Sequence, residues 1–515
     1  MILNNSRSLI YFFTLLFFSF IYFILFKNFY ILDYEVPDFF AYSSWWSERN
    51  FNHSKDNFST LFVFISQFSQ FYYYEFKIAS LLLISFSIFI FNLTSLFLNN
   101  LLSKILFIIS NFSIGSFYYI YGKLYYEFPF ISFFFSIIFL LSIYFLFLLK
   151  NDKIEKKVHF FILFLLAFLI GFLISWKSHS IFPLYGLGLL VLLSRTNLIL
   201  NIFLYNFKNF LIFSFFIILG WSIGNFSIFY SIGDTYYGLK NVYQIKNIFF
   251  EFKKLYWHFF ETVSMYNYDH VTTTSFTYGI YNFISLLILL FILPFFTKHK
   301  LKFMFVNISI FFFYSVFIMF FSTGYIWHGF SISLYIIVLI YYYLLEIDKN
   351  KNQKYIFSLI IVCVMTQVYF NYNYIKTSLN QIDITNIAVE KIEENSEKII
   401  LDIEKLITEN NLNNKNFCIV SELKRKKILN NYNILEATHK SELNKIQMKS
   451  KSYMLNSKLQ CANSKYIIGF KPKIIDQIIY YHPTYNNLIN KIERNDYIVY
   501  FYLKEDSSIF PIWPK

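Results

Sequence analysis

Long apolar runs, separated by shorter polar stretches, occupy the chain up to about residue 370. A helix needs roughly 20 mostly apolar residues to cross a bilayer, with a usual range of about 17–25. The runs therefore predict an all-α polytopic membrane domain with about 11 transmembrane helices. The candidate spans are Leu9–Phe26, Ile78–Leu98, Leu101–Tyr121, Phe130–Leu149, Phe160–Trp176, Ile181–Leu193, Phe210–Tyr230, Gly279–Phe296, Phe303–Phe321, Phe330–Leu345 and Tyr355–Phe370.

Two segments need separate interpretation. The first run is long for the apolar part of a signal peptide, and no small-residue cleavage site follows it, so we interpret it as a retained helix. The segment Leu198–Asn209 is shorter and carries Lys208, which predicts a helix lying in the membrane interface. With only 13 Gly and 8 Pro in the chain, the spans are expected to be long and little interrupted, and none is expected to be broken by Gly or Pro.

The composition supports a membrane protein. Apolar residues make up 57% of the chain and charged residues only 15%, whereas about 25% charged residues is usual for soluble domains. This composition excludes a soluble enzyme, a disordered chain and a disulfide scaffold. The net charge of +14 does not require nucleic acid as a partner, because membrane proteins gather Lys and Arg in their cytoplasmic loops.

Basic residues fall in alternate connections between the candidate spans. Because cytoplasmic loops are enriched in Lys and Arg, this side is predicted to be cytoplasmic. The N-terminus is then inside, and whatever follows the eleventh span is outside. The basic residues are Arg7, Lys104, Lys150, Lys153, Lys156, Lys157, Arg195, Lys298, Lys300, Lys302, Lys349, Lys351 and Lys354.

The composition changes at Asn371, where Asn, Lys, Glu and Asp become frequent. We therefore expect a membrane domain over residues 1–370 and a small extracytoplasmic α/β domain over residues 371–515. The elements predicted in the second domain are a helix at Ile384–Ile407 and strands at Phe417–Val420, Tyr466–Phe470 and Tyr497–Tyr502.

Two of the three cysteines, Cys418 and Cys461, fall in the second domain, and Cys363 falls in the last span. Outside the cytoplasm a Cys418–Cys461 disulfide is one interpretation, and two buried thiols are the other. No Cys/His spacing indicates a zinc site.

Acidic residues gather at the start of the first outer loop, where Asp33, Glu35 and Asp38 lie within six residues. Low dielectric and mutual repulsion at a membrane boundary raise a carboxyl pKa, which suits a general base. Glu127 lies in a short second outer loop. The structural alternatives are a solvated loop for the three acids and a carboxylate at a helix start for Glu127.

Cations lie on the same predicted side. Lys177 and His179 occupy a short turn between two spans, where a cation can hold a phosphate group. His328 lies in an aromatic-rich outer loop. The alternatives are a lysine that extends to the interface and a structural histidine.

These motifs resemble the GT-C superfamily of polytopic glycosyltransferases, in particular its branch of protein O-mannosyltransferases and aminoarabinose transferases. The segment Asp33-Tyr34-Glu35 is similar to the acidic motif that opens the family's first outer loop. Glu127-Phe128-Pro129-Phe130 is similar to the acid and proline of the second outer loop. Lys177 corresponds to the lysine at the end of the family's fifth span. Because Tyr34 splits the family's adjacent acid pair, three acids compete for the base role.

The resemblance extends to later loops and covers about Leu9 to Leu345. Glu261 and Asp269-His270 resemble the family's large loop, and Tyr325 to His328 resemble a late loop before a returning helix. By this resemblance Glu261, His270 and His328 are expected to bind substrate.

The resemblance implies transfer of a sugar from a polyprenyl-phosphate donor to a lipid, glycan or protein acceptor outside the cytoplasm. One of Asp33, Glu35 and Asp38 is expected to serve as the base, assisted by Glu127, while Lys177 and His179 hold the donor phosphate. No residue cluster indicates a metal, and no cofactor is expected. Enrichment in Lys, Asn, Phe and Ile is typical of an AT-rich bacterial genome, so we expect a bacterial inner-membrane protein with a periplasmic C-terminal domain.

Two other functions fit the sequence less well. A polysaccharide (O-antigen-type) polymerase or ligase also uses lipid-linked sugars, but typically through Arg-rich outer loops, and Arg49 is the one Arg in these loops. A transporter or flippase for lipid-linked sugars would show interrupted spans and internal repeats.

Overall fold

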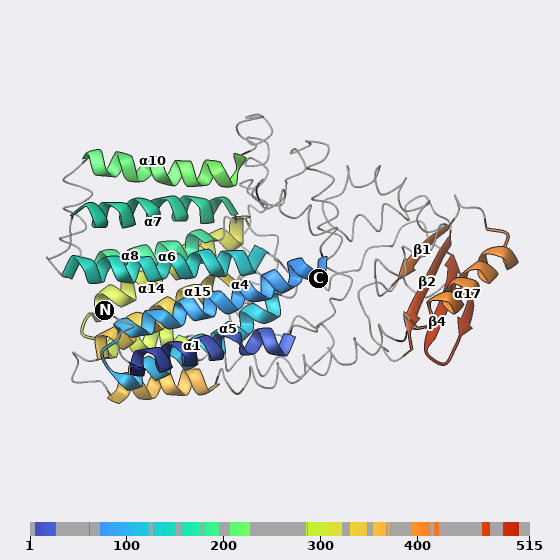
Figure 1. The fold of residues 1–515 in the computed structure, drawn as a ribbon, viewed down its shortest axis with the longest axis horizontal. Coiled ribbons are helices and arrows are strands. Elements are labelled where there is room, and N and C mark those ends of the chain that lie inside the picture. Colours follow the sequence, from blue (N-terminus) through green and yellow to red (C-terminus); the bar gives the residue numbers. More distant parts are fainter. Residues whose placement is uncertain are drawn as a thin grey trace. The chain divides into compact units, whose positions relative to one another are not determined.

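The computed structural model describes residues 6–26, 61, 73–122, 127–150, 156–176, 180–194, 207–226, 285, 287–321, 330–347, 354–366, 369, 391, 394–412, 417–421, 466–473 and 488–503. These residues form two compact units. The helical unit contains the described residues up to Tyr369, and the C-terminal unit contains those from Lys391 onward (Figure 1).

Helices dominate the first unit. They are α1 (Ser6–Phe26), α4 (Tyr73–Thr94, continued by the short 3₁₀ helix η3, Ser95–Phe97), α5 (Leu101–Gly122), α6 (Glu127–Lys150), α7 (Lys156–Trp176), α8 (Ile181–Ser194), α10 (Phe207–Gly224), η7 (Ile288–Ile292), η8 (Leu293–Phe296), α14 (Lys300–Phe321), α15 (Phe330–Ile347) and a helix over Lys354–Thr366.

The prediction of a mostly helical chain with a small C-terminal α/β unit is confirmed. Each of the eleven apolar runs contains helix where it is described. Two described helical segments, Pro129–Leu148 and Phe207–Gly224, are long and apolar enough to cross a membrane. The number of membrane spans therefore stays a prediction.

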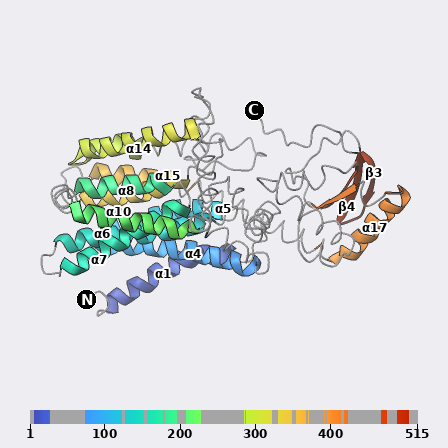
Figure 2. The ribbon, with the colours of Figure 1, turned by 90° about the horizontal axis from the view of Figure 1, so that it is seen from above.

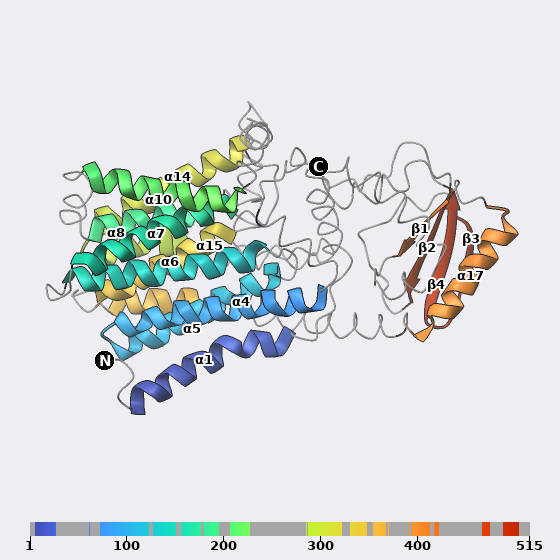
Figure 3. The same ribbon diagram turned by 45° about the horizontal axis from the view of Figure 1, so that its top comes forward.

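The helices run side by side along a common direction (Figures 1, 2 and 3). α4 and α6 point the same way. Phe91 contacts Phe135, with ring centroids 6.1 Å apart, and beyond them Phe97 contacts Phe147 at 5.5 Å. One helix, α5, lies between them in the chain, so α4 and α6 are expected to have the same direction if successive helices alternate in direction.

Helices of opposite direction also pack together. Phe182, near the start of α8, packs edge-on against Tyr314, near the end of α14, with ring centroids 5.2 Å apart. At the other end of this pair, the Lys302 ammonium donates a hydrogen bond to the Leu193 carbonyl over 3.1 Å. In the remaining ring contacts, helices of opposite direction meet with the start of one beside the end of the other, and α7 and α10, which run in the same direction, meet at matching depths. Helix direction therefore alternates along the chain.

Alternation gives the helical unit two chemically different ends. At one end α1, α5, α7, α10 and α14 begin and α4, α6, α8 and α15 finish. We call it the basic end, because all Lys and Arg residues described in this unit except Lys77 lie there. They are Arg7, Lys104, Lys150, Lys156, Lys157, Lys208, Lys298, Lys300, Lys302 and Lys354. We call the other end the opposite end.

The boundary predicted between an interfacial helix and the next span at Asn209 was wrong. Phe207, Lys208 and Asn209 form the first turn of α10, and residues 198–206 lie outside the described residues. A lysine in the first turn keeps its ammonium in water while its stem lies along the helix, so its charge does not exclude it from a span.

The prediction that no span is broken by Gly or Pro was also wrong for the segment before α14. Here the π-helical turn η7 passes directly into the 3₁₀ turn η8. The Leu293 N–H bonds the Ile288 carbonyl, and Pro294 has no N–H to offer. The Leu289 and Leu290 carbonyls thereby lose the partners that a regular helix would supply.

Side chains from two other helices replace those partners. The Tyr343 hydroxyl donates to the Leu289 carbonyl over 2.8 Å, and the Asn307 amide donates to the Leu290 carbonyl over 2.6 Å. The Tyr335 hydroxyl in turn donates to the Asn307 amide oxygen. Because a buried carbonyl without a donor costs free energy, these side chains make the interruption tolerable.

A second buried polar connection links the first helices of the unit. The Asn111 amide of α5 donates to the Asn92 amide oxygen of α4 over 2.8 Å. The Asn92 amide donates to the Ser19 hydroxyl of α1 over 3.3 Å. All three side chains are buried, so the polar contacts fix these helices in register.

α7 and α10 lie against each other with their backbones in direct contact (Figure 1). Gly171 of α7 faces the Ile217 carbonyl, and Gly220 of α10 faces the Phe168 carbonyl. The absence of a side chain at both glycines allows this approach, which is typical of helix pairs in membranes.

The C-terminal unit is a four-stranded sheet with one helix. Its elements are α17 (Ser396–Glu409), β1 (Phe417–Ser421), β2 (Tyr466–Pro472), β3 (Leu488–Glu493) and β4 (Tyr497–Leu503). The strand order is β1-β2-β4-β3, with β1 parallel to β2 and the other pairs antiparallel. β3 was not predicted, because Asn490, Lys491 and Glu493 interrupt its apolar pattern.

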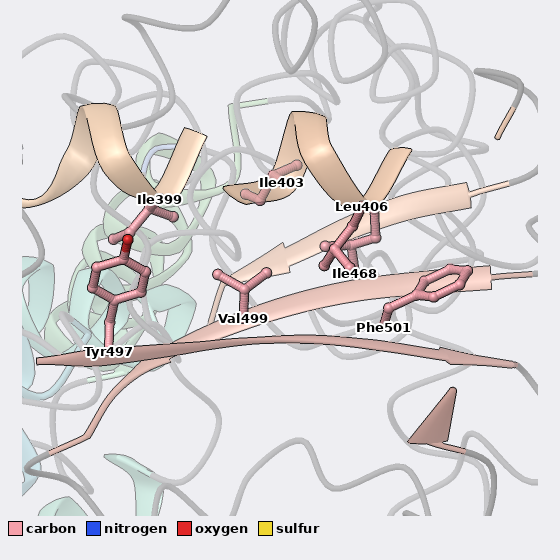
Figure 4. Close-up of a cluster of buried hydrophobic side chains, with 7 residues drawn as sticks. All are labelled: Ile399, Ile403, Leu406, Ile468, Tyr497, Val499 and Phe501. Atoms are coloured by element: carbon pink, nitrogen blue, oxygen red, sulfur yellow. The ribbon is translucent and has the colours of Figure 1, made fainter. Parts of the chain in front are cut away.

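α17 packs on the sheet through one apolar stripe. Ile399, Ile403 and Leu406 follow helical spacing and contact Ile468 of β2 and Val499 of β4, among other residues of the core (Figure 4). α17 begins at Ser396, after a turn at Asn395, and Lys391 and Glu394 before it are also helical. Residues 384–390 and 392–393 lie outside the described residues, so the predicted start at Ile384 stays a prediction.

The cysteine predictions have separate outcomes. Cys418 lies on β1, opposite Ile467 of β2, while Cys461 lies outside the described residues, so the disulfide stays a prediction. Cys363 is a buried free thiol whose sulfur lies 3.5 Å from the Ser285 carbonyl oxygen.

Asp402 of α17 ties the helix to the turn between β3 and β4. Its carboxylate accepts two hydrogen bonds from the Arg494 guanidinium, one of them over 2.8 Å, and a third from the Tyr497 hydroxyl over 2.8 Å. The Arg494 bond holds the pKa of the Asp402 carboxyl below its usual value, and the Tyr497 bond acts in the same direction.

The first prediction concerns the α7–α10 contact. Ala at Gly171 or Gly220 places a Cβ against backbone atoms of the facing helix, which cannot move aside as a side chain can. Overpacking of this kind costs about 1–3 kcal/mol, so both variants should melt at lower temperature in detergent. Gly188 is the matched control, because a Cβ there meets nothing within 4 Å. A Gly188→Ala variant that loses as much stability as Gly220→Ala contradicts the proposed contact.

The second prediction concerns Asp402. Since its pKa is lowered by folding, its contribution to stability is present above the unfolded value of about 3.9 and is lost as the pH falls through the folded value. Asp402→Asn should destabilise the C-terminal unit at neutral pH by about 1–2 kcal/mol, and the difference from wild type should shrink as the pH falls below about 4 and vanish below the folded pKa. Hydrogen exchange of α17 amides in the full chain measures this. Glu409→Gln, which removes an exposed ion pair with Lys405, should change little.

Candidate functional site

Eight of the nine predicted site residues lie outside the described residues. They are Asp33, Glu35, Asp38, Lys177, His179, Glu261, His270 and His328. The ninth, Glu127, is the first residue of α6. The structure therefore places the helix ends that flank the candidate site, and the chemistry of the eight residues stays a prediction.

The flanking helix ends lie at the opposite end of the helical unit. α1 finishes at Phe26, before the Asp33 motif, and α7 finishes at Trp176, directly before Lys177. α8 begins at Ile181, just after His179, and α15 begins at Phe330, just after His328. Because helix direction alternates, the chain enters or leaves these three loops at the opposite end, where Lys77 is the one basic residue among those that the structure describes.

A direct aromatic contact joins two of these helix ends. Trp176, the last residue of α7, stacks on Phe130 in the first turn of α6, with ring centroids 4.9 Å apart and an interplanar angle of 30°. Trp176 is only 1% exposed and also contacts Phe134 and Phe172. The stack therefore joins the helix start that bears Glu127 to the helix end that directly precedes Lys177 in the chain.

The sequence contained a signal for this cluster that was not used. Phe130 and Phe134 lie four residues apart on α6, as do Phe172 and Trp176 on α7. Residues four apart share one face of a helix, so each pair forms a continuous aromatic surface. The antiparallel packing of α6 and α7 brings the two surfaces together.

The position of Glu127 agrees with both interpretations of this residue. A carboxylate at the first residue of a helix is stabilised by the unpaired N–H groups and the helix dipole. Pro129 is also tolerated there, because its missing N–H has no partner within the first turn. Glu127 thus has a structural reason for its place, and a catalytic role rests on what the neighbouring loops bring to it.

Metal binding was tested on the described ranges only. Among these residues no group of three or more His, Cys, Asp and Glu side chains is arranged to hold a metal ion. The acids of the first outer loop are not among them, so the prediction of a metal-free site stays a prediction.

Comparison with known proteins found no matching family model, no matching curated protein and no matching solved structure. The resemblance to GT-C glycosyltransferases therefore rests on the motifs of the sequence itself.

Proposed function

We propose that this protein is an integral membrane glycosyltransferase that moves a sugar from a polyprenyl-phosphate donor to a lipid, glycan or protein acceptor. In this proposal the opposite end of the helical unit faces the periplasm of a bacterial inner membrane. The N-terminus is cytoplasmic and the C-terminal unit is periplasmic, as the distribution of Lys and Arg favours.

The observation that carries the proposal is the stack of Trp176 on Phe130. It holds the helix start that bears Glu127 beside the helix end that leads into Lys177. A transferase for lipid-phosphate sugars needs a carboxylate near the acceptor hydroxyl and a cation near the departing phosphate. The stack gives the two residue types a common anchoring point at one end of the bundle.

The reaction assigns a role to each group. Asp33 takes the proton of the acceptor hydroxyl, and the hydroxyl oxygen forms a bond to the anomeric carbon of the sugar. The bond between this carbon and the phosphate oxygen breaks, and polyprenyl phosphate leaves. Lys177 and His179 stabilise the negative charge that grows on the phosphate. Glu127 orients the acceptor, while Glu35 and Asp38 support the base.

One observation favours a different function. The interruption at η7 and η8 is of the kind that transporters use near the middle of the membrane. The sequence disfavoured a transporter for lipid-linked sugars in part because no span was expected to be broken by Gly or Pro. A transporter or flippase is therefore the second candidate. Asn307 and Tyr343 bond the freed carbonyls, which reduces the capacity of this segment to bind a substrate.

The third prediction tests the acids. Asp33→Asn preserves shape and removes basicity, and general-base catalysis typically contributes about 10²–10⁴-fold. Transfer from a polyprenyl-phosphate donor by the purified variant should fall by at least about 100-fold, with unchanged membrane insertion. Glu127→Gln should be similarly harmful, and Asp38→Asn less so.

The controls separate a wrong residue from a wrong function. If Asp33→Asn keeps full activity and Glu35→Gln or Asp38→Asn abolishes it, the base has been misassigned. If all four acid variants transfer sugar at the wild-type rate, the acids are not catalytic. If the wild-type chain instead moves a fluorescent lipid-linked sugar across vesicle membranes without transferring it, the protein is a transporter.

The fourth prediction tests Lys177. If its ammonium binds the donor phosphate, Lys177→Ala should raise the KM for the donor, and Lys177→Arg should partly restore it because the charge returns. Titration of the donor at saturating acceptor measures both constants. A Lys177→Ala variant with wild-type kcat and KM removes this residue from the site and supports a lysine that only extends to the interface.

A further inference from the structure

Four lysines lie at the basic end, on two neighbouring helix starts. Lys298 precedes α14, Lys300 and Lys302 lie in its first turn, and Lys354 begins the helix over Lys354–Thr366. The two starts are adjacent, because Phe296 and Tyr355 have ring centroids 5.8 Å apart. We call Lys298, Lys300, Lys302 and Lys354 the lysine cluster.

The lysine cluster has an excess of positive charge. All four side chains are exposed. Glu346 is the carboxylate described at the basic end, and its oxygen lies 3.7 Å from a His299 nitrogen. Lys302 directs its ammonium to the Leu193 carbonyl at the end of α8, a position where the helix dipole favours a cation.

The other lysines occupy positions that the helix dipole disfavours. A helix start carries partial positive charge and normally attracts Asp or Glu, whereas α14 has no acidic residue in its first turn. Exposed lysines at adjacent helix starts repel each other and the dipole. An anion lying between them offsets both effects.

Exposed apolar side chains lie beside the lysines. Phe295 is 62% exposed, Leu301 77% and Tyr355 61%. A soluble anion would not contact this apolar surface, whereas a phospholipid has both a charged headgroup for the lysines and acyl chains for the apolar side chains. Lysines beside an apolar helix surface are also the arrangement expected for contact with anionic lipids at the cytoplasmic face of a membrane.

We propose that the lysine cluster is a binding site for anionic phospholipid of the inner leaflet, with the phosphodiester held by the ammonium groups and the acyl chains lying along Phe295, Leu301 and Tyr355. The site lies at the basic end of the helical unit, and the helix ends that flank the predicted catalytic loops lie at the opposite end. It requires the helical unit to be in a membrane, but it requires no sugar transfer.

The test uses the full chain in lipid nanodiscs and spin-labelled lipids with identical acyl chains. The signal from motionally restricted lipid compares phosphatidylglycerol, which is anionic, with phosphatidylcholine, which is zwitterionic. The wild type should prefer phosphatidylglycerol, and this preference should fall at least about tenfold in the variant with Lys298, Lys300, Lys302 and Lys354 all changed to Gln. The same positions changed to Arg should keep the preference, because the charge is retained.

A control variant with the same loss of charge carries Gln at Lys398, Lys405, Lys473 and Lys491 of the C-terminal unit and should bind lipid like the wild type. If the four-Gln variant does not fold, a variant with Gln at Lys298, Lys300 and Lys354 replaces it, because this variant keeps the bond between Lys302 and Leu193. It should lose most of the preference for phosphatidylglycerol.

Four results would overturn the proposal: a wild type without preference, a cluster variant that keeps it, a control that loses as much, or equal displacement of lipid by inorganic phosphate. The last result would identify free phosphate as the ligand. The lipid preference does not depend on sugar transfer, so it should be the same in the Asp33 and Glu127 variants as in the wild type. The two proposals can therefore fail independently.

Discussion

Stacking of Trp176 on Phe130 holds the end of α7 against the start of α6, and the arrangement of the candidate site depends on it. Helices in a bilayer gain little from the hydrophobic effect, so specific packing must fix their positions. Aromatic stacking at one helix end and glycine contacts between α7 and α10 supply such packing. The loop that contains Lys177 and His179 begins at this fixed end of α7, and the loop before Glu127 ends at the fixed start of α6.

A second constraint is that every backbone group in an apolar environment needs a partner. The interruption at Pro294 violates it locally, and Asn307 and Tyr343 restore it from two other helices. In the proposed membrane setting, the need for backbone partners explains why polar side chains occur in apolar helices. No substrate is required to explain them. The same compensation also explains how a proline-containing segment can stay buried near the basic end of the helical unit.

The sequence predicted the helices well because apolar runs of bilayer length have few other interpretations. It did not predict the π turn at Ile288–Ile292, because the compensating donors Asn307 and Tyr343 are distant in the chain. It missed β3, where polar residues on an exposed strand hide the alternation. For the candidate site, the sequence indicated Glu127 and Lys177 as residue types, but the contact between the helix ends next to them depends on tertiary packing of α6 against α7.

The central claim is that the chain positions of Glu127 and Lys177 meet on the outer side of the membrane. The most direct test changes both to Cys in a chain whose Cys363, Cys418 and Cys461 are replaced by Ser, and treats intact cells with a short bifunctional thiol reagent that cannot cross membranes. The account predicts a cross-link without permeabilisation, seen as linked peptides after proteolysis. A cross-link that forms only after permeabilisation would contradict it. The absence of a cross-link, although each thiol reacts with a monofunctional reagent, would contradict it as well.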